Sequence, residues 1–373
     1  MVFDPNDATR ETVLAGGVSG GLWRNTKISD KANSWELLDI PENLAISVIA
    51  YDPNDTNTIY VGTGESYTFG VVVGNGVWKS TNNGQTWTHV FGGATGVTTS
   101  TGSGQVEVHG QFYVNDLVIR NNNGNSEVYV GIGSSRYKDI LISTFLGINQ
   151  YGLFKSTNDG GNWLKIDIKT EPNSNVQFEP NDIEIDDNGN IWIGTTRNVY
   201  GLGGGAILKS NDGNTFQAMH AITNGARTEI EITQNKIYVL AEIKNSDPPV
   251  SILRTEDGFS TSPTQLPLPN DADDGIPAND FTRGQAFYDL MIEADPNNED
   301  VVYVGGIDLF KSTNSGDSWT QISKWSNNNN LNDLNVSLVH ADQHAMAFAD
   351  SDRLIFGHDG GVSYSDDGGN TLG

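Results

Sequence analysis

The octapeptide Ser80-Thr-Asn82-Asn-Gly84-Gln-Thr-Trp87 decides the fold, because its pattern S-x-N-x-G-x-x-W recurs along the chain. The Ser and Asn side chains of such a segment can hydrogen-bond the backbone of their own turn. Its Gly supplies a backbone conformation that other residues rarely adopt. We call this segment the box and assign it a structural role, in which its Trp packs into the blade.

The box occurs in five clear copies and two weaker ones. The copy at 210–216 is one residue shorter than the others, and the copy at 365–372 has Leu in place of Trp. The weaker copies lie at 255–258 and between Asn25 and Trp35. The residues to which we assign structural roles are Ser80, Asn82, Gly84, Trp87, Ser156, Asn158, Gly160, Trp163, Ser210, Asp212, Gly213, Phe216, Ser312, Asn314, Gly316, Trp319, Ser365, Asp367 and Gly369.

Short strand-like segments surround each box in the same order. An apolar run that ends in a basic residue, such as 77–79, precedes the box, and a second apolar run, such as 59–62, lies further upstream. A turn rich in Asp, Asn and Pro precedes that run, and another strand precedes the turn. Each repeat therefore consists of strand A, turn, strand B, loop, strand C, box and strand D. Seven such repeats predict an all-β fold, a β-propeller of about seven four-stranded blades.

The repeats predict one propeller domain over residues 1–373. The first repeat begins late in strand A and the last stops at its box, so we expect the chain to be a fragment, truncated at both ends, of a larger propeller protein. Either the missing strands come from residues outside this piece, or the ring has more blades. The expected blades lie roughly at 1–40, 41–110, 111–175, 176–224, 225–284, 285–335 and 336–373.

Composition excludes several classes of protein. Asp and Glu number 47 against 21 Lys and Arg, a formal net charge of −26. This charge argues against nucleic-acid binding, which needs clustered basic side chains, and against anionic membrane surfaces. No apolar run reaches about 18 residues, so no membrane span is expected. Without cysteine there is no disulfide scaffold, thiol nucleophile or Cys-ligated zinc site. Residues 1–4 lack the basic and apolar regions of a signal peptide.

The boxes resemble the Asp-box, or BNR, repeat of sialidases, sortilin-type receptors and xyloglucanases. Val61-Gly-Thr-Gly-Glu65, Tyr288-Asp-Leu290, His340-Ala-Asp342-Gln-His344 and Gly357-His-Asp-Gly-Gly361 resemble secreted, glycosyl-hydrolase-like or sortilin-like propeller proteins of Bacteroidetes. The resemblance implies a secreted or cell-surface protein that carries a type IX secretion sorting domain, which this piece lacks. The Arg-Ile-Pro motif of sialidases and the opening glycine-rich motifs of xyloglucanases are missing, so the resemblance implies fold and location more than a reaction.

A histidine-rich group is the strongest candidate site. In a regular blade the D–A and B–C loops share the face opposite the boxes, and long loops on a rigid scaffold commonly carry function. His340, Asp342 and His344 alternate at the start of a strand A, and His358 and Asp359 lie in the B–C turn of the same repeat. His340 and His344 would lie about 13 Å apart on an ideal strand, too far to share a metal unless the strand bulges. The group is interpreted as a hydrogen-bonded plug, a sugar contact, or a divalent-metal site using His340 and Asp342.

Paired carboxylates form a second candidate. Asp182 and Glu184 alternate with Ile on one predicted strand A, and Glu229 and Glu231 do so on another. Such carboxylates would line the central channel, where they could act as the acid and base of glycoside hydrolysis or remain a solvated acidic surface that holds cations. The candidate catalytic residues are Asp342, Asp359, Asp182 and Glu229.

The remaining candidates are ligand contacts. The acidic loop at 271–275 with Asp280 could bind calcium, which prefers oxygen ligands, but it lacks the EF-hand frame, which favours a solvated acidic loop. No other cofactor is required. The candidate substrate-binding residues are His340, His344, His358, Glu65, Tyr67, Tyr137 and Arg197.

Two functions follow. The first is an extracellular glycan-processing or glycan-binding module with a site on the loop face, whose partner is a polysaccharide or cell-surface glycan and whose activity, if it is an enzyme, is glycoside hydrolase-like. The second is a non-catalytic adhesion or protein-interaction scaffold that binds a protein ligand.

Overall fold

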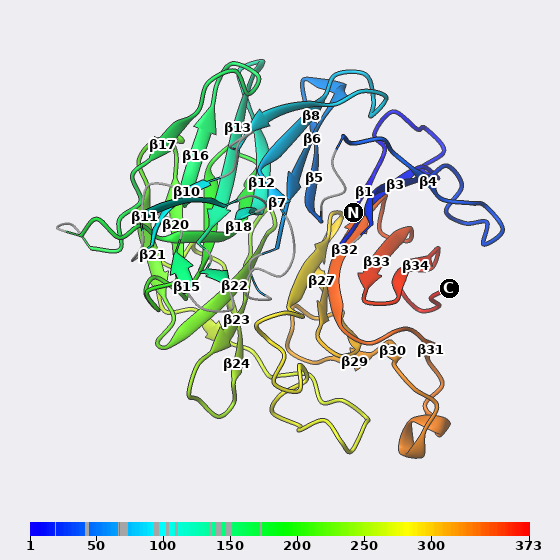
Figure 1. Ribbon diagram of the computed structural model, residues 1–373. Coiled ribbons are helices and arrows are strands. Elements are labelled where there is room, and N and C mark those ends of the chain that lie inside the picture. Colours follow the sequence, from blue (N-terminus) through cyan, green and yellow to red (C-terminus); the bar gives the residue numbers. More distant parts are fainter. Residues whose placement is uncertain are drawn as a thin grey trace. The chain divides into compact units, whose positions relative to one another are not determined.

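The computed structural model describes residues 1–18, 20–41, 45–65, 67, 74–92, 97–101, 104–108, 111–134, 136–138, 143–145, 151–171 and 174–373. The chain divides into two compact units. Residues 2–204 and 208–217 form one unit, called the N-terminal unit, and residues 1, 205–207 and 218–373 form the other, called the C-terminal unit. Over the described ranges the structure is built of strands, with one short 3₁₀ helix at Asn329–Asp333 (Figure 1). None of the described helices is long and apolar enough to cross a membrane.

The prediction of an all-β propeller fold is confirmed. Seven antiparallel sheets follow one another along the chain, and the strands within each sheet pair in sequence order, from A to D. The seventh sheet has three described strands, so its fourth position is not filled by a described strand. The third sheet gains a fifth strand, because β7 (Gly74–Asn75) pairs in parallel with β12 (Gln111–Asn122).

The N-terminal unit contains the first three sheets and most of the fourth, since β20 and β21 each include residues counted in the C-terminal unit. Two small hairpins, β10–β11 and β14–β15, accompany these sheets. The strands are β1 (Val2–Phe3), β2 (Val13–Gly17), β3 (Gly21–Asn25), β4 (Glu36–Leu37), β5 (Ile46–Asp52), β6 (Asp55–Thr63), β8 (Val77–Ser80), β9 (Thr88–Phe91), β10 (Val97–Thr101), β11 (Gly104–Val108), β13 (Asn125–Gly133), β14 (Arg136–Lys138), β15 (Ser143–Phe145), β16 (Gly152–Ser156), β17 (Leu164–Ile166), β18 (Glu179–Ile185), β19 (Ile191–Thr196), β20 (Ala206–Ser210) and β21 (Gln217–Ala221).

The C-terminal unit contains the last three sheets and a short parallel pair, β30–β31. Its strands are β22 (Gly225–Ile232), β23 (Ile237–Ile243), β24 (Val250–Thr255), β25 (Thr264–Gln265), β26 (Met291–Asp295), β27 (Asn298–Gly305), β28 (Leu309–Ser312), β29 (Thr320–Gln321), β30 (Ser323–Lys324), β31 (Ser337–Leu338), β32 (Gln343–Phe348), β33 (Leu354–His358) and β34 (Gly361–Ser365).

The second strand of each sheet forms the centre of the core. Ile59, Tyr60 and Val61 of β6 are fully buried, and β13, β23 and β27 bury equivalent runs. Both faces of such a strand are covered by neighbouring sheets, so it is continuously apolar rather than alternating. Apolar clusters accordingly join consecutive sheets: one links Leu14 to Trp78 across the first two sheets.

The box geometry follows from its side chains. Ser80 Oγ accepts the Gly84 N–H at 2.9 Å and donates to Asn82 Oδ1 at 2.9 Å. Asn82 Oδ1 also accepts the Thr86 N–H at 2.9 Å, and Gly84 has a φ of +80°. Trp163, in the next box, donates its indole N–H to the Val90 carbonyl at 2.8 Å. The tryptophan therefore packs against the fourth strand of the preceding sheet.

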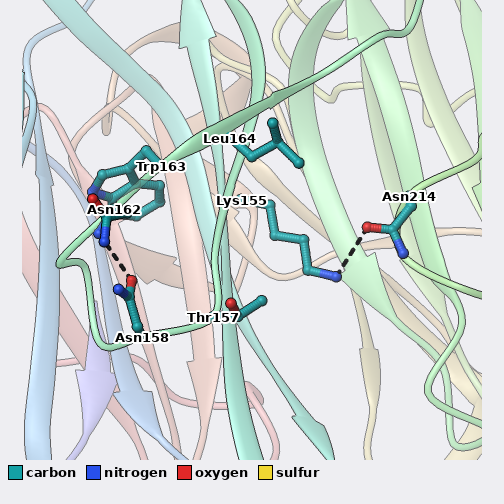
Figure 2. A pocket seen from close by; sticks show the side chains of 7 residues that line it. All are labelled: Lys155, Thr157, Asn158, Asn162, Trp163, Leu164 and Asn214. Carbon is teal, nitrogen blue, oxygen red and sulfur yellow. Dashed lines mark hydrogen bonds between the residues drawn. The ribbon is translucent and has the colours of Figure 1, made fainter.

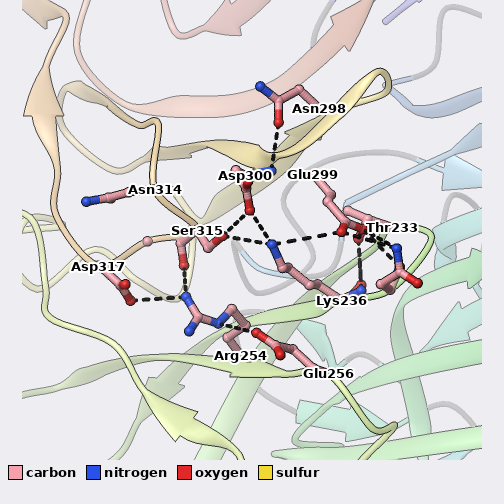
Figure 3. A network of polar contacts seen from close by, with 12 residues as sticks. Thr233, Lys236, Arg254, Glu256, Asn298, Glu299, Asp300, Asn314, Ser315 and Asp317 are labelled. Carbon is pink, nitrogen blue, oxygen red and sulfur yellow. Dashed lines mark hydrogen bonds and ion pairs between the residues drawn. The ribbon is translucent and has the colours of Figure 1, made fainter.

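The basic residue at the end of strand C joins consecutive sheets. Lys79 Nζ donates to the Asp159 carbonyl at 3.3 Å, Arg254 to the Ser315 carbonyl at 2.6 Å, and Lys311 to the Gly368 carbonyl at 2.7 Å. In each bridge the acceptor belongs to the box of the following sheet. Figure 3 shows one bridge within a larger network, in which Arg254 also meets Asp317 at 3.0 Å and Lys236 meets Asp300.

Candidate functional site

Three segments of the C-terminal unit bring the histidine-rich group together. They are the long loop between β25 and β26, the segment that leads into β32, and the turn between β33 and β34. Backbone hydrogen bonds connect these segments. The Asp359 N–H donates to the Asp342 carbonyl at 3.2 Å, and Ile307, between β27 and β28, donates to the Phe281 carbonyl and accepts the Asp342 N–H, each at 3.2 Å. We call Gln285, Tyr288, Asp342, His344 and Asp359 the Asp359 cluster.

Asp359 is the centre of this cluster. His344 Nε2 lies 2.8 Å from Asp359 Oδ1, and the Tyr288 hydroxyl donates to the same oxygen at 3.1 Å. The rings of Tyr288 and His344 meet edge to face, with centroids 4.5 Å apart. The side chains of His344 and Asp359 are 27% and 36% exposed, so a ligand can reach both. Tyr288 was not among the predicted site residues, because its position in a loop has no periodic signal.

Asp342 does not lie on a strand, contrary to the sequence-based expectation. Strand β32 begins at Gln343, and Asp342 has a left-handed backbone with a φ of +66°. A register shift between Gln343 and Ala345 also breaks the alternation on which the expected 13 Å spacing depended. The Gln285 amide donates to Asp342 Oδ1 at 3.0 Å. Burial, reinforced by the Asp359 carboxylate, raises the pKa of Asp342.

His340 and His358 form a second layer beside the cluster. Their rings stack with centroids 6.1 Å apart. A Cβ at Gly360 would lie 2.6 Å from the His340 Cβ, so this approach requires glycine. The Gly360 N–H donates to His358 Nδ1 at 3.1 Å, which leaves His358 Nε2 to donate to Ser363 Oγ at 3.0 Å. Burial, with the charge of His340, lowers the pKa of His358 to about 4, so its imidazole is neutral at pH 7.

Asp289 is a buried acid that was not among the predicted site residues. Its side chain is fully buried, and neither carboxyl oxygen has a hydrogen-bond partner within the described residues. Burial, with the Asp342 carboxylate, raises the pKa of Asp289 to about 9. Asp289 is therefore a neutral acid at pH 7. Its only sequence signal was its place in the motif Tyr288-Asp-Leu290.

Two of the four predicted channel carboxylates, Glu229 and Asp182, have different surroundings. Glu229 is paired with Arg227, whose Nε lies 2.7 Å from Glu229 Oε1, so its charge is neutralised locally. Asp182 is half-buried on β18, which belongs to the N-terminal unit. A register shift between Pro180 and Asp182 again interrupts the simple alternation.

One predicted ligand contact of the N-terminal unit, Tyr67, bonds a residue close in sequence to a buried acid. The Tyr67 hydroxyl donates to Asn181 Oδ1 at 2.6 Å. Close in sequence to Asn181, Glu179 is almost fully buried and bonded to the Ser134 hydroxyl, and burial raises the pKa of Glu179 to about 8. Glu65 and Arg197 are half-buried. Tyr137 lies on β14, and its side chain lies outside the described residues.

The acidic loop uses its carboxylates to hold its own turns. Asp271 Oδ1 accepts the Asp273 N–H and Asp280 Oδ1 accepts the Thr282 N–H, at 2.8 and 3.2 Å. The Gln321 amide joins Asp271 to the fully buried Asp308. Within the ranges that the structure describes, no three His, Asp or Glu side chains are arranged to hold a metal ion. Calcium binding by this loop stays a prediction.

Comparisons of sequence relate a small part of the chain to a xyloglucanase. No protein-family model matches the chain. A stretch of 105 residues is 30% identical to the xyloglucanase Xgh74A of Acetivibrio thermocellus. The match covers 24% of this chain and 11% of that protein, so the chain spans about a tenth of the length of this curated relative.

Solved structures share the fold over the whole chain. YCF48 from Cyanidioschyzon merolae has a TM-score of 0.57 at 14% identity, covering 100% of this chain and 96% of that one. YCF48 bound to D1 peptide has a TM-score of 0.57 at 11% identity, covering 98% and 91%. The GH74 xyloglucanase of Xanthomonas campestris has a TM-score of 0.56 at 15% identity, covering 100% and 59%. At these identities the likeness establishes the propeller fold.

Proposed function

We propose that this chain is a glycan-binding or glycan-processing propeller module that works outside the cell, with its site at the Asp359 cluster. The observation that carries the proposal is the meeting of the Tyr288 hydroxyl and the His344 imidazole on one half-exposed carboxylate oxygen. Carboxylates, imidazoles and amides that converge beside aromatic rings are the groups that bind sugar hydroxyls and sugar faces. Phe287, adjacent in sequence, is 41% exposed and adds an apolar surface.

The comparisons support a glycan more than any other partner. The xyloglucanases among the similar proteins act on a polysaccharide, as their names state. The cluster also holds two acids in different surroundings: burial raises the pKa of Asp342, while Asp359 is paired with His344. Hydrolysis of a glycosidic bond uses two carboxyl groups, one as acid and the other as base or nucleophile. Secretion, sortilin-type relationship and type IX sorting stay predictions from the sequence resemblance.

A protein ligand is the second candidate. The structure of YCF48 with a peptide shows that a propeller of this fold can bind a polypeptide. In that case the same loops would hold a protein partner without turnover, and the boxes would serve the scaffold alone.

The test is a screen of the whole chain against neutral and acidic polysaccharides, measuring retention in affinity gels and release of reducing ends. We expect Asp359→Asn and Tyr288→Phe to weaken retention about tenfold each, because each removes a hydrogen bond of about 1–1.5 kcal/mol. If the module is catalytic, Asp342→Asn should abolish release of reducing ends.

The matched control is Asp274→Asn, an exposed carboxylate of the same long loop. It should leave retention unchanged. Retention of no polysaccharide, or retention that none of the cluster variants alters, would move support to the protein-interaction scaffold.

A further inference from the structure

We propose that Asp289 and Asp342, together with the side-chain oxygen of Gln285, bind a calcium ion in the C-terminal unit. Gln285 and Asp289 lie in the long loop between β25 and β26, and Asp342 lies directly before β32. The site is distinct from the metal sites that the sequence predicted, because its ligands include neither His340 nor residues 271–275. It does not depend on the proposed glycan function, although it shares Gln285 and Asp342 with the Asp359 cluster.

Asp289 carries two oxygens that need a partner. Its side chain is fully buried, and neither carboxyl oxygen has a hydrogen-bond partner within the described residues. Arg227 is a cation whose charge acts on this carboxyl group. It is committed elsewhere, because it pairs with Glu229 at 2.7 Å and donates to two main-chain carbonyls. Buried polar groups are normally hydrogen-bonded or bound to an ion, so this unpaired carboxyl group indicates a bound ligand.

One turn of the loop brings further oxygens to Asp289. The Asp289 N–H donates to the Gln285 carbonyl at 3.0 Å, and a hydrogen bond over four residues puts both side chains on one side of the turn. The Gln285 amide N–H donates to Asp342 Oδ1 at 3.0 Å, which holds that carboxylate beside the same turn. Within the described residues, Gln285 Oε1 and Asp342 Oδ2 accept no hydrogen bond, so both are available to a cation.

The donor set selects calcium among the common metal ions. It consists only of oxygens, two from Asp289 and one each from Asp342 and Gln285. Calcium takes about six to eight oxygen ligands in a flexible geometry, so water would complete its shell, whereas magnesium demands a near-ideal octahedron. Zinc and copper favour nitrogen or sulfur ligands. The two carboxylates balance the double charge, and a site with two acids agrees with the absence of a three-acid metal group among the described residues.

Calcium would replace a proton on Asp289. Burial, with the Asp342 carboxylate, raises the pKa of Asp289 to about 9, so the acid keeps its proton at pH 7 when no cation is bound. Metal binding to a protonated ligand releases that proton, so binding is best measured at pH 8. Asp342 and Gln285 are half-buried, so the ion reaches Asp289 from their side.

A pocket in the N-terminal unit offers the opposite chemistry. It has a volume of about 390 Å³ and lies between the box that follows β16 and the shorter box at 210–216. None of its lining residues is acidic, and Lys155 donates to Asn214 Oδ1 at 3.3 Å beside it (Figure 2). A cation finds no carboxylate ligand there, so we expect no calcium site in this pocket.

The test is titration of the whole chain with CaCl₂ alone at pH 8, after divalent ions have been removed with EDTA and dialysis. We expect calorimetry to show saturable binding of one calcium ion by this site, and the melting temperature to rise by several degrees at about 2 mM calcium. Magnesium should bind at least about tenfold more weakly. NaCl of equal ionic strength should not reproduce the rise in melting temperature.

Asp289→Asn should weaken calcium binding at least about tenfold, because a neutral amide replaces a coordinating carboxylate. This variant should fold, since the wild-type acid is itself neutral in EDTA, and Asp342→Asn provides a second test. Asp274→Asn, an exposed carboxylate of the same loop, should bind calcium like the wild type. The proposal is overturned if calcium does not bind at millimolar concentration, or if both ligand variants bind it unchanged. Loss of binding in Asp274→Asn alone would also overturn it, because the ion would then occupy the acidic loop.

Discussion

Two carboxyl groups near the proposed glycan site differ in burial. The Asp359 side chain is 36% exposed and paired with His344, whereas the Asp289 side chain is fully buried and has no hydrogen-bond donor within the described residues. Desolvation penalises the ionised form of an acid, and a like charge adds to that penalty. Asp289 is therefore neutral at pH 7, whereas the carboxylate of Asp359 accepts hydrogen bonds from Tyr288 and His344. Both acids lie in loops, but only Asp289 is fully removed from water.

The pH dependence of stability tests the state of Asp289. Burial raises its pKa to about 9, so between about pH 4 and pH 9 the unfolded chain loses this proton while the folded chain keeps it. Wild-type stability should thus fall with rising pH relative to Asp289→Asn, which cannot ionise. We expect the variant to melt several degrees above the wild type at pH 8 and close to it at pH 4, by scanning calorimetry at constant ionic strength. A difference that does not vary with pH contradicts this assignment, and Asp274→Asn serves as the exposed control.

Strands of the N-terminal unit are joined by a buried ion network. Glu127 of β13 is 7% exposed and lies 2.9 Å from Arg120 Nε and 3.0 Å from Lys155 Nζ. Glu127 Oε2 also accepts a hydrogen bond from the Tyr129 hydroxyl at 2.9 Å. Arg120 donates further to the carbonyls of Gly189 and Asp212. A single carboxylate therefore balances two cations that bridge to the next sheet.

Removing that carboxylate should be costly. Glu127→Gln leaves two buried cations without a counter-charge, a change that typically costs about 3–5 kcal/mol. We expect a clear fall in the urea midpoint of unfolding. Glu256→Gln is the comparison, since Glu256 is 64% exposed and its 3.6 Å pair with Arg254 should contribute less than about 1 kcal/mol. Equal effects of the two substitutions would show that the Glu127 network does not stabilise the fold.

The sequence predicted the order of the strands. It did not predict register shifts within the strands or the paths of the long loops. The box recurs with a fixed hydrogen-bonding pattern, so its copies mark each C–D turn wherever they occur. Register shifts at the first strand of several sheets, such as that between Val114 and Asp116, have no signature in the alternation of residues. The same limit hid Tyr288 and Asp289, because the path of a long loop is set by tertiary contacts. Arg227, two residues before Glu229, was a readable sign that this carboxylate is paired.

The charge of the whole chain is the property that composition gives directly. A net charge of −26 makes the folded state repel itself at low ionic strength. Part of this charge is used locally, since Asp4, Asp52 and Asp295 each accept a backbone N–H in a turn. That the seven sheets form a single domain stays a prediction.

Stability should accordingly rise with salt. Raising NaCl from about 0.01 M to about 0.15 M shortens the screening length from about 30 Å to about 8 Å. We expect the urea midpoint to increase over this range, and equally with KCl, because screening does not distinguish the two cations. The measurement includes EDTA to remove divalent ions. A midpoint that falls, or that rises with only one of the salts, would contradict a general electrostatic effect.

The bridges from each strand C to the following box have an evolutionary consequence. Lys79, Arg254 and Lys311 donate to main-chain carbonyls, although the residues that supply these carbonyls are Asp159, Ser315 and Gly368. A main-chain carbonyl is present whichever side chain a residue carries. Amino-acid substitutions in a box therefore do not remove the acceptor of this hydrogen bond. An in-frame duplication of one repeat can therefore produce a new blade. Its strand-C cation can bond the main chain of the following box without a compensating substitution in the neighbouring repeat.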